Sequence, residues 1–226
     1  MAAYQKCRRL GCDALPMIVA IHGLGDEPRN FAGLLAGLPV QARVILPRAI
    51  DDHEVGWSWF PVRARDPDVE ALAKGIVRAA DAVDAGVRRL EVSRPTLGKP
   101  IVTGFSQGGM LTFALAVRHP DHYAAAMPVG GWLPPPLWPE ALGDAAPPPI
   151  VALHGDADPA VKIQPTRDAV AKLDELGANA ALHEYPGIGH MIPPDMRTEL
   201  HQLLVDAVKR VRAQAEANTD AARAAG

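Results

Sequence analysis

Apolar residues along the chain follow two patterns, short continuous runs and longer stretches with a helical period. The runs are MIVAIH (17–22), ARVILP (42–47), PIVTGF (100–105), AAAMPVG (124–130), IVALHG (150–155) and AALHEY (180–185). Several are apolar at consecutive positions, which is typical of strands covered on both faces. Because the runs alternate with helical stretches, they predict an α/β fold with a mostly parallel central sheet flanked by helices on both faces.

The helical stretches carry apolar residues three or four positions apart. We expect helices over 69–90, from Ser106 to the pair His119-Pro120, over 166–176, and from about 195 to 212. Residues 213–226 lose the apolar stripe, and we expect a flexible tail there. The chain is therefore predicted to form one domain, residues 1–226, with its core at about 17–212.

Two segments break the alternation of strand and helix. Residues 48–67 contain GWSWFP, and residues 131–149 read GWLPPPLWPEALGDAAPPP. The second is too rich in proline for a helix or strand interior, yet it carries several large apolar residues. It could pack on the core, form the wall or lid of a hydrophobic pocket, or serve as an oligomer interface, and a homodimer is one arrangement the sequence allows.

Composition narrows the class of protein. Of the 226 residues, 48% are hydrophobic and 22% are charged, and the formal net charge is −3, so no basic footprint for nucleic acid appears. Cys7 and Cys12 are the two cysteines, and we interpret them as a free pair in a reducing compartment. No apolar stretch fits a signal peptide or a membrane span, so we expect a cytoplasmic protein.

The stretch PIVTGFSQGGML (100–111) contains a Gly-x-Ser-x-Gly motif centred on Ser106. The motif alone is weak evidence, but it lies between an expected strand and an expected helix, where a nucleophile elbow belongs. Such a sharp turn brings its flanking residues close together, so Gly104 and Gly108 are suited to it. The helix that follows points its first N–H groups at the serine.

A serine hydroxyl needs a base and an acid that orients the base, and both are expected on loops after later strands. Of eight histidines, His190 alone lies on a glycine-rich loop after a late strand. We interpret His53, His119, His122 and His201 as surface residues, and His22, His154 and His183 as structural residues. Asp156 and Asp158 both follow the strand at 150–155. We favour Asp158 as the acid and expect Asp156 to cap the turn.

The negative oxygen formed during acyl transfer needs preorganised N–H donors. One expected donor is the backbone N–H of Gln107, directly after Ser106. The other is the N–H of Leu24, in the glycine-containing loop AIHGLGDEP (20–28). That loop lacks the third glycine and the lysine of nucleotide-binding turns, which argues against a phosphate site.

Four motifs, HGLGD, GFSQGG, HGDADPAV and GIGH, follow one another in this order. Together they resemble the small serine carboxylesterases of the α/β-hydrolase fold, the group that contains acyl-protein thioesterases and bacterial phospholipase/carboxylesterase-like enzymes. The resemblance covers about residues 17–210. It implies a triad of Ser106, Asp158 and His190, an oxyanion hole at Leu24 and Gln107, hydrolysis of short- to medium-chain esters or thioesters, and no metal or organic cofactor.

Departures from that family pattern fall near the expected acyl pocket. Pro61 stands where the family usually has aspartate, and Glu27-Pro28 replace smaller residues. The candidates for substrate contact, each of which could be a core residue instead, are Trp57, Trp59, Phe60, Trp132, Leu133 and Met191. The same scaffold could also cleave amides, transfer acyl groups or act as a catalytically silent binding protein.

Overall fold

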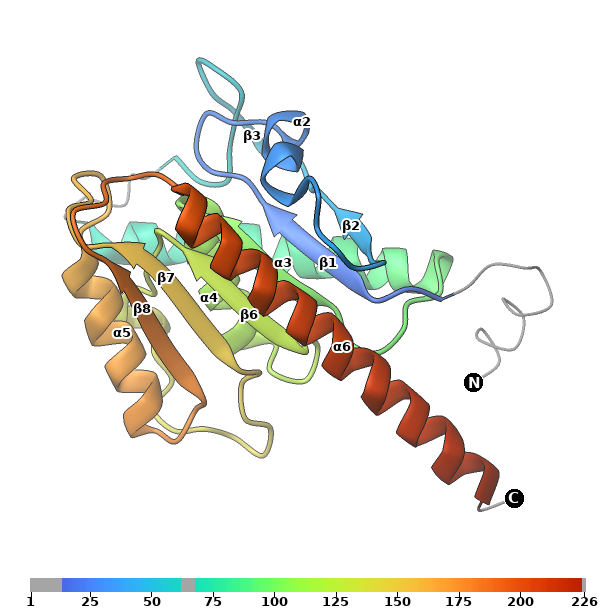
Figure 1. Ribbon diagram of the computed structural model, residues 1–226. Coiled ribbons are helices and arrows are strands. Elements are labelled where there is room, and N and C mark those ends of the chain that lie inside the picture. The colour runs from blue at the N-terminus through green and yellow to red at the C-terminus, as the bar shows by residue number, and fades with distance from the viewer. Residues whose placement is uncertain (1–13, 62–67, 225–226) are drawn as a thin grey trace.

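The computed structural model describes residues 14–61 and 68–224. Six strands form one parallel sheet in the order β2-β1-β5-β6-β7-β8 (Figure 1). They are β1 (Met17–Ile21), β2 (Arg43–Ile45), β5 (Ile101–Phe105), β6 (Ala125–Val129), β7 (Ile150–Gly155) and β8 (Ala180–Tyr185). Every strand lies within one of the apolar runs, so the predicted sheet is confirmed.

Helices cover both faces of the sheet. The helices α3 (Val69–Ser93), α4 (Gln107–Arg118) and α5 (Ile163–Glu175) pack on one face. The other face is covered by α6 (Pro194–Ala224) together with the short α2 (Pro28–Phe31) and η1 (Ala32–Leu35), and in Figure 1 α6 crosses in front of the sheet. Successive side chains of β1 alternate between the two cores, as the period of a strand requires.

Helix boundaries agree with the sequence pattern except at the C-terminal end. α4 ends at Arg118, and α5 ends just before Gly177, whose φ of 88° suits a residue without a side chain. α6, however, continues to Ala224 instead of ending near residue 212. Alanine, glutamine, glutamate and arginine favour helix, and residues 213–224 contain no glycine or proline. The loss of the apolar stripe therefore does not stop the helix. Residues 225–226 of the expected tail lie outside the described range.

A small hairpin is joined to the loop after β1. Its strands are β3 (Asp51–Asp52) and β4 (Trp57–Ser58), and they pair antiparallel. The N–H of Gly25 donates to the Trp57 carbonyl at 2.9 Å, and the N–H of Trp57 donates to the Asp26 carbonyl at 3.1 Å. The loop expected to supply an oxyanion donor is thus held by a second element.

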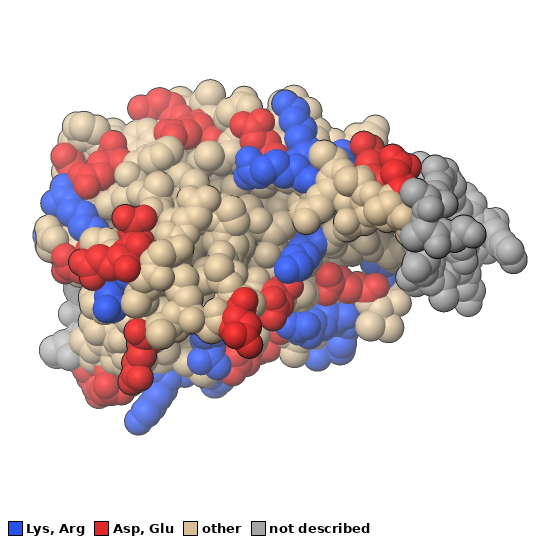
Figure 2. Space-filling model, turned by 90° about the horizontal axis from the view of Figure 1, so that it is seen from below, with Lys and Arg blue, Asp and Glu red and all other residues tan. Residues whose placement is uncertain are grey.

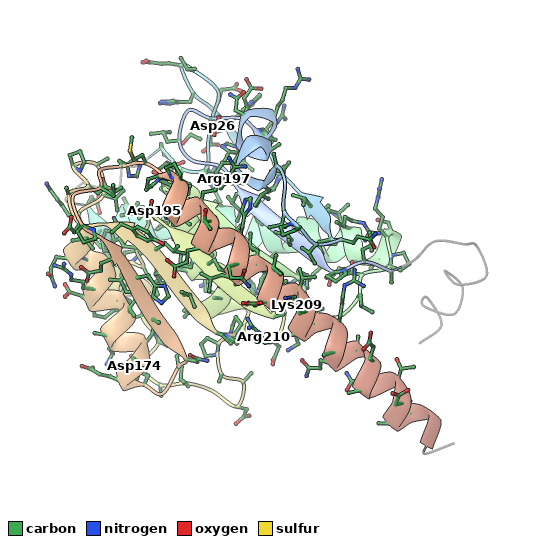
Figure 3. All side chains as sticks on the ribbon, in the orientation of Figure 1. Asp26, Asp174, Asp195, Arg197, Lys209 and Arg210 are labelled. Carbon is green, nitrogen blue, oxygen red and sulfur yellow. The ribbon has the colours of Figure 1, made fainter. Side chains whose placement is uncertain are left out.

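Helix α6 is joined to the α2–η1 segment at its first turns. Arg197 donates to the carbonyl oxygens of Gly33, Leu34 and Ala36 at 2.8–3.1 Å, and Figure 3 shows it beside this segment. His201 also bonds to the Leu34 carbonyl, at 2.7 Å. The last helix therefore holds a segment more than 160 positions earlier in the chain.

The surface carries both signs of charge. Figure 2 shows acidic and basic side chains interspersed around an uncharged area, without a large region of one sign on that face. Within the described residues, no helix has a stretch long and apolar enough to cross a membrane.

Candidate active site

Three of the predicted site residues follow the carboxyl ends of strands. Ser106 directly follows β5, Asp158 lies on the loop after β7, and His190 lies on the loop after β8. Parallel strands end at the same edge of a sheet, and open α/β sheets bind ligands at this edge. The fold thus brings together residues that are up to 84 positions apart.

Ser106 has a strained backbone. Its φ of 57° and ψ of −117° make it the one non-glycine residue with positive φ in the described part of the chain. Its N–H donates to the Val129 carbonyl at 2.9 Å, and its own carbonyl accepts the N–H of Met110 at 3.0 Å. Hydrogen bonds on both sides hold the serine in this turn between β5 and α4.

The flanking glycines are needed because backbone groups approach closely. A Cβ at Gly104 would lie 2.5 Å from the carbonyl oxygen of Gly108, and a Cβ at Gly108 would lie 2.0 Å from the carbonyl oxygen of Ile21. Neither distance leaves room for a carbon atom. The steric requirement expected from the sequence is therefore met at both positions.

His190 bridges Ser106 and Asp158. Its Nε2 lies 2.9 Å from Ser106 Oγ, and its Nδ1 lies 2.5 Å from Asp158 Oδ2. An ionised carboxylate can only accept, so Nδ1 carries the proton and Nε2 is left to accept from the serine hydroxyl. The imidazole also packs on the Phe105 ring, with 4.7 Å between the centroids. This contact limits the rotation of His190.

Asp158 is buried and held by its own loop. Its Oδ1 accepts the N–H groups of Ala160 and Val161, both at 2.8 Å, which leaves Oδ2 for His190. Asp156 is exposed and accepts the N–H of Gly187 at 2.6 Å. The two carboxylates therefore differ in their contacts, since Asp156 caps a turn and Asp158 contacts the histidine.

Two backbone N–H groups lie next to the serine. Gln107 is the first residue of α4, so its N–H has no acceptor within the helix. Leu24 follows Gly23, which packs closely against Ser106. A Cβ placed on Gly23 would lie 3.3 Å from the Cβ of Ser106. Among the hydrogen bonds formed by the described residues, none uses the N–H of Leu24 or of Gln107.

The side chain of Gln107 has a role that the sequence did not reveal. Its Oε1 accepts the N–H of Trp59 at 3.0 Å, and its Nε2 donates to the Phe60 carbonyl at 2.9 Å. It thereby ties the segment after β4 to the start of α4. Sequence analysis assigned Gln107 a backbone role alone, because its side-chain partners are 47 and 48 positions away.

Four of the predicted substrate contacts belong to the core. Trp59, Phe60 and Leu133 are 1%, 0% and 0% exposed, and a side chain without exposed surface cannot line an open pocket. Trp59 also donates from Nε1 to the His22 carbonyl at 2.8 Å. Trp132 is buried in the same apolar cluster, with 8% exposure.

Trp57 and Met191 are the more accessible candidates for substrate contact. The guanidinium of Arg48 lies 4.0 Å from the ring centroid of Trp57, a cation–π contact. Met191 is 58% exposed and adjoins His190 in the chain. Met191 is thus an exposed apolar side chain one position after His190 in the chain.

The proline-rich segment 131–149 packs on the core. Leu137, Trp138 and Leu142 contact the same buried cluster as Leu133, and Trp138 Nε1 donates to the Leu133 carbonyl at 2.8 Å. Of the roles considered for this segment, packing on the core is the one that the structure shows.

The remaining histidines include one that sequence analysis placed wrongly. His122 was expected at the surface, but it is buried between Asp84 and Glu91, with 2.5 Å from Nδ1 to Asp84 and 2.7 Å from Nε2 to Glu91. Burial opposes its charge, yet these two hydrogen bonds raise its pKa above the ordinary value. His22 and His154 are fully buried, as expected of structural residues.

Metal-ligating side chains do not gather in the described part of the chain, where no group of three His, Cys, Asp or Glu residues could hold an ion. The two cysteines of the sequence, Cys7 and Cys12, lie outside the described residues.

Comparison with known proteins gives a consistent picture. A sequence profile of the family described as phospholipase/carboxylesterase matches residues 12–205. A relative from Nocardia uniformis subsp. tsuyamanensis named "Putative esterase NocK" is 30% identical over 168 residues, which are 70% of this chain and 45% of that protein. The chain thus spans less than half the length of this relative.

Two solved structures have the same architecture. The crystal structure of esterase PE8 superposes with a TM-score of 0.76 at 27% identity, covering 86% of this chain and 93% of that one. Acyl-protein thioesterase 2 of Zea mays superposes with a TM-score of 0.68 at 25% identity, covering 86% and 94%.

Proposed function

Because the chain belongs to the phospholipase/carboxylesterase family of α/β-hydrolases, we propose that it cleaves short- to medium-chain carboxylic esters through an acyl-enzyme on Ser106. The observation that carries this proposal is the continuous hydrogen-bonded chain from Ser106 through His190 to the buried Asp158. A strained serine within reach of a correctly oriented imidazole is the arrangement that nucleophilic acyl transfer needs.

In the proposed acylation step, Ser106 Oγ attacks the ester carbonyl while His190 Nε2 takes the hydroxyl proton. The carbonyl π electrons move onto oxygen, which the N–H groups of Leu24 and Gln107 stabilise. When the tetrahedral intermediate collapses, the bond to the leaving alcohol breaks and His190 returns the proton to it. Asp158 stays ionised and stabilises the imidazolium.

Deacylation repeats the sequence with water as the nucleophile. His190 removes a proton from water, the hydroxide adds to the acyl carbon, and Ser106 leaves with the proton. The products are a carboxylic acid and an alcohol. All proton transfers use the chain's own residues, so the scheme needs no cofactor.

For the substrate, we propose a small acyl ester whose acyl group contacts Met191 and Trp57 near the entrance. A thioester is the second candidate, favoured by the likeness to the maize acyl-protein thioesterase. The serine mechanism is the same for both, because only the leaving atom differs.

Two variants test the chemistry. Ser106→Ala should reduce turnover of p-nitrophenyl butyrate by about 10⁴-fold or more and abolish labelling by a fluorophosphonate, with an unchanged circular dichroism spectrum. Asp156→Asn is the matched control and should stay within about threefold of the wild type, since Asp156 contacts a backbone turn. Full turnover by Ser106→Ala would refute the proposal. A wild-type protein that neither turns over esters nor reacts with the probe would instead indicate a catalytically silent binding protein.

A chain-length series then defines the substrate. Matched p-nitrophenyl esters and acyl thioesters from two to twelve carbons, compared by kcat/KM, show which leaving atom and length are preferred. Amide and alcohol-acceptor assays on the same preparation separate hydrolysis of esters from amide cleavage and acyl transfer. The localisation in the cytoplasm and the homodimer stay predictions, which fractionation and light scattering would test.

A further inference from the structure

A second histidine lies directly behind the proposed catalytic acid. His154, near the end of β7, is fully buried and has no part in the proton transfers proposed above. Its Nε2 lies 2.9 Å from the carbonyl oxygen of Val161 and 3.5 Å from Asp158 Oδ2. Its Nδ1 lies 2.9 Å from the hydroxyl oxygen of Thr166 on α5. Both ring nitrogens are thus engaged.

The protonation state of His154 follows from these contacts. A carbonyl oxygen can only accept, so Nε2 carries a proton and points it at Val161. Burial lowers the pKa of His154, which favours the neutral ring and leaves Nδ1 as an acceptor that faces the Thr166 hydroxyl. Thr166 is also buried and donates to the carbonyl oxygen of Gly131 at 3.0 Å, so its single hydroxyl proton is shared between Gly131 and Nδ1 of His154.

The imidazole of His154 also holds the loop that carries Asp158. Val161 accepts from His154 through its carbonyl and donates through its N–H to Asp158 Oδ1 at 2.8 Å. The other carboxylate oxygen, Oδ2, faces both the N–H of His154 and Nδ1 of His190. Rotation of the His154 ring would therefore disturb the loop and the carboxylate together.

We propose that His154 is a positioning residue for Asp158: its Nε2–H fixes the loop at 158–161 through Val161 and directs a positive dipole at Oδ2. The effect on the reaction passes through Asp158, which keeps the orientation in which it accepts from His190. This inference rests on the proposed triad. It gives a buried histidine a role in the reaction that does not involve contact between its ring nitrogens and the substrate.

A matched pair of substitutions tests this role. His154→Gln keeps an amide N–H near the position of Nε2, whereas His154→Leu removes the donor at similar volume. We expect His154→Leu to lower kcat by about 10- to 100-fold, as displacement of a catalytic group by a fraction of an ångström to 1 Å would do. KM should stay within about twofold, and His154→Gln should recover most of the loss.

A double-mutant cycle separates positioning from general loss of structure. If His154 acts through Asp158, then His154→Leu added to Asp158→Asn should cost less than about twofold further. The second-order rate of Ser106 labelling by a fluorophosphonate measures this without turnover. Equal losses in both backgrounds, or no loss in the single variant, would overturn the inference. No loss in Asp158→Asn alone would instead overturn the proposed triad.

A second variant serves if His154→Leu does not fold. Thr166→Val removes the hydroxyl that holds Nδ1 and leaves the shape nearly unchanged, and Thr166→Ser keeps the hydroxyl. We expect Thr166→Val to lower kcat about 3- to 10-fold in the wild type and to have no effect beyond Asp158→Asn. Identical kinetics of the valine and serine variants would contradict the role of His154.

Discussion

Gly108 offers a sharp test of how closely α4 approaches β1. Both Gly108 and Gly86 lie inside helices, where glycine-to-alanine exchange ordinarily stabilises by up to about 1 kcal/mol. A Cβ on Gly108, however, would lie 2.0 Å from the Ile21 carbonyl oxygen and 2.8 Å from that of His22. Real contacts stay above 3.0 Å, so β1 and α4 must separate by about 1 Å. Both obstructing atoms belong to the backbone, so neither side can yield by rotating a side chain.

We expect Gly108→Ala to lower the free energy of unfolding by about 3 kcal/mol or more, at the upper end for an overpacked core. That corresponds to a fall of about 1 M or more in the urea midpoint, followed by circular dichroism. Gly86→Ala is the control, because the nearest atom is the flexible end of Arg89 at 3.8 Å, and it should raise the midpoint slightly. A Gly108→Ala midpoint equal to or above the wild type would refute the steric reasoning about the serine turn.

Three further predictions concern stability. Gln107→Leu should cost about 1–3 kcal/mol in urea unfolding, because it leaves the buried N–H of Trp59 without an acceptor; an unchanged midpoint would contradict this. His122, whose pKa is raised by Glu91 and Asp84 against burial, contributes stability that is complete below about pH 6.5 and lost as pH rises through its folded-state pKa. The stability difference between wild type and His122→Gln should therefore shrink from pH 6 to 9. A difference that grows over this range would contradict a raised pKa of His122. Removal of residues 213–226 should leave the thermal midpoint within about 2 °C, since most of the side chains described there are exposed; a larger drop would mean that the end of α6 is held more firmly.

The sheet could be predicted because its four central strands, β1, β5, β6 and β7, are largely buried on both faces and therefore appear as continuous apolar runs, whereas the edge strands β2 and β8 are only partly buried. The end of α6 could not be predicted from the apolar pattern, because the described residues beyond Val211 stay helical through intrinsic propensity although none of the described side chains there is fully buried. An amphipathic pattern indicates which part of a helix packs on the core, and α6 continues beyond that part.

At the site, local motifs identified residues whose neighbours in the chain define their geometry. Ser106 directly follows β5, Asp158 lies three residues after β7, and both are next to diagnostic glycines or turns. His122 and the side chain of Gln107 were missed because their partners come from elements 31 to 48 positions away, and nothing adjacent in the sequence indicates them. The burial of Trp59 and Phe60 was missed for the same reason, because their backbone groups bond to the side chain of Gln107, which is distant in the sequence.

The placement of α6 has a consequence for synthesis of the chain. This helix covers Ile18 and Ala20 on one face of the sheet, and Arg197 ties it to the segment at 33–36. Until α6 has been synthesised, that face is covered only by the short α2 and η1. Native closure must follow synthesis of α6, so the nascent chain presents an apolar sheet face during translation until α6 docks.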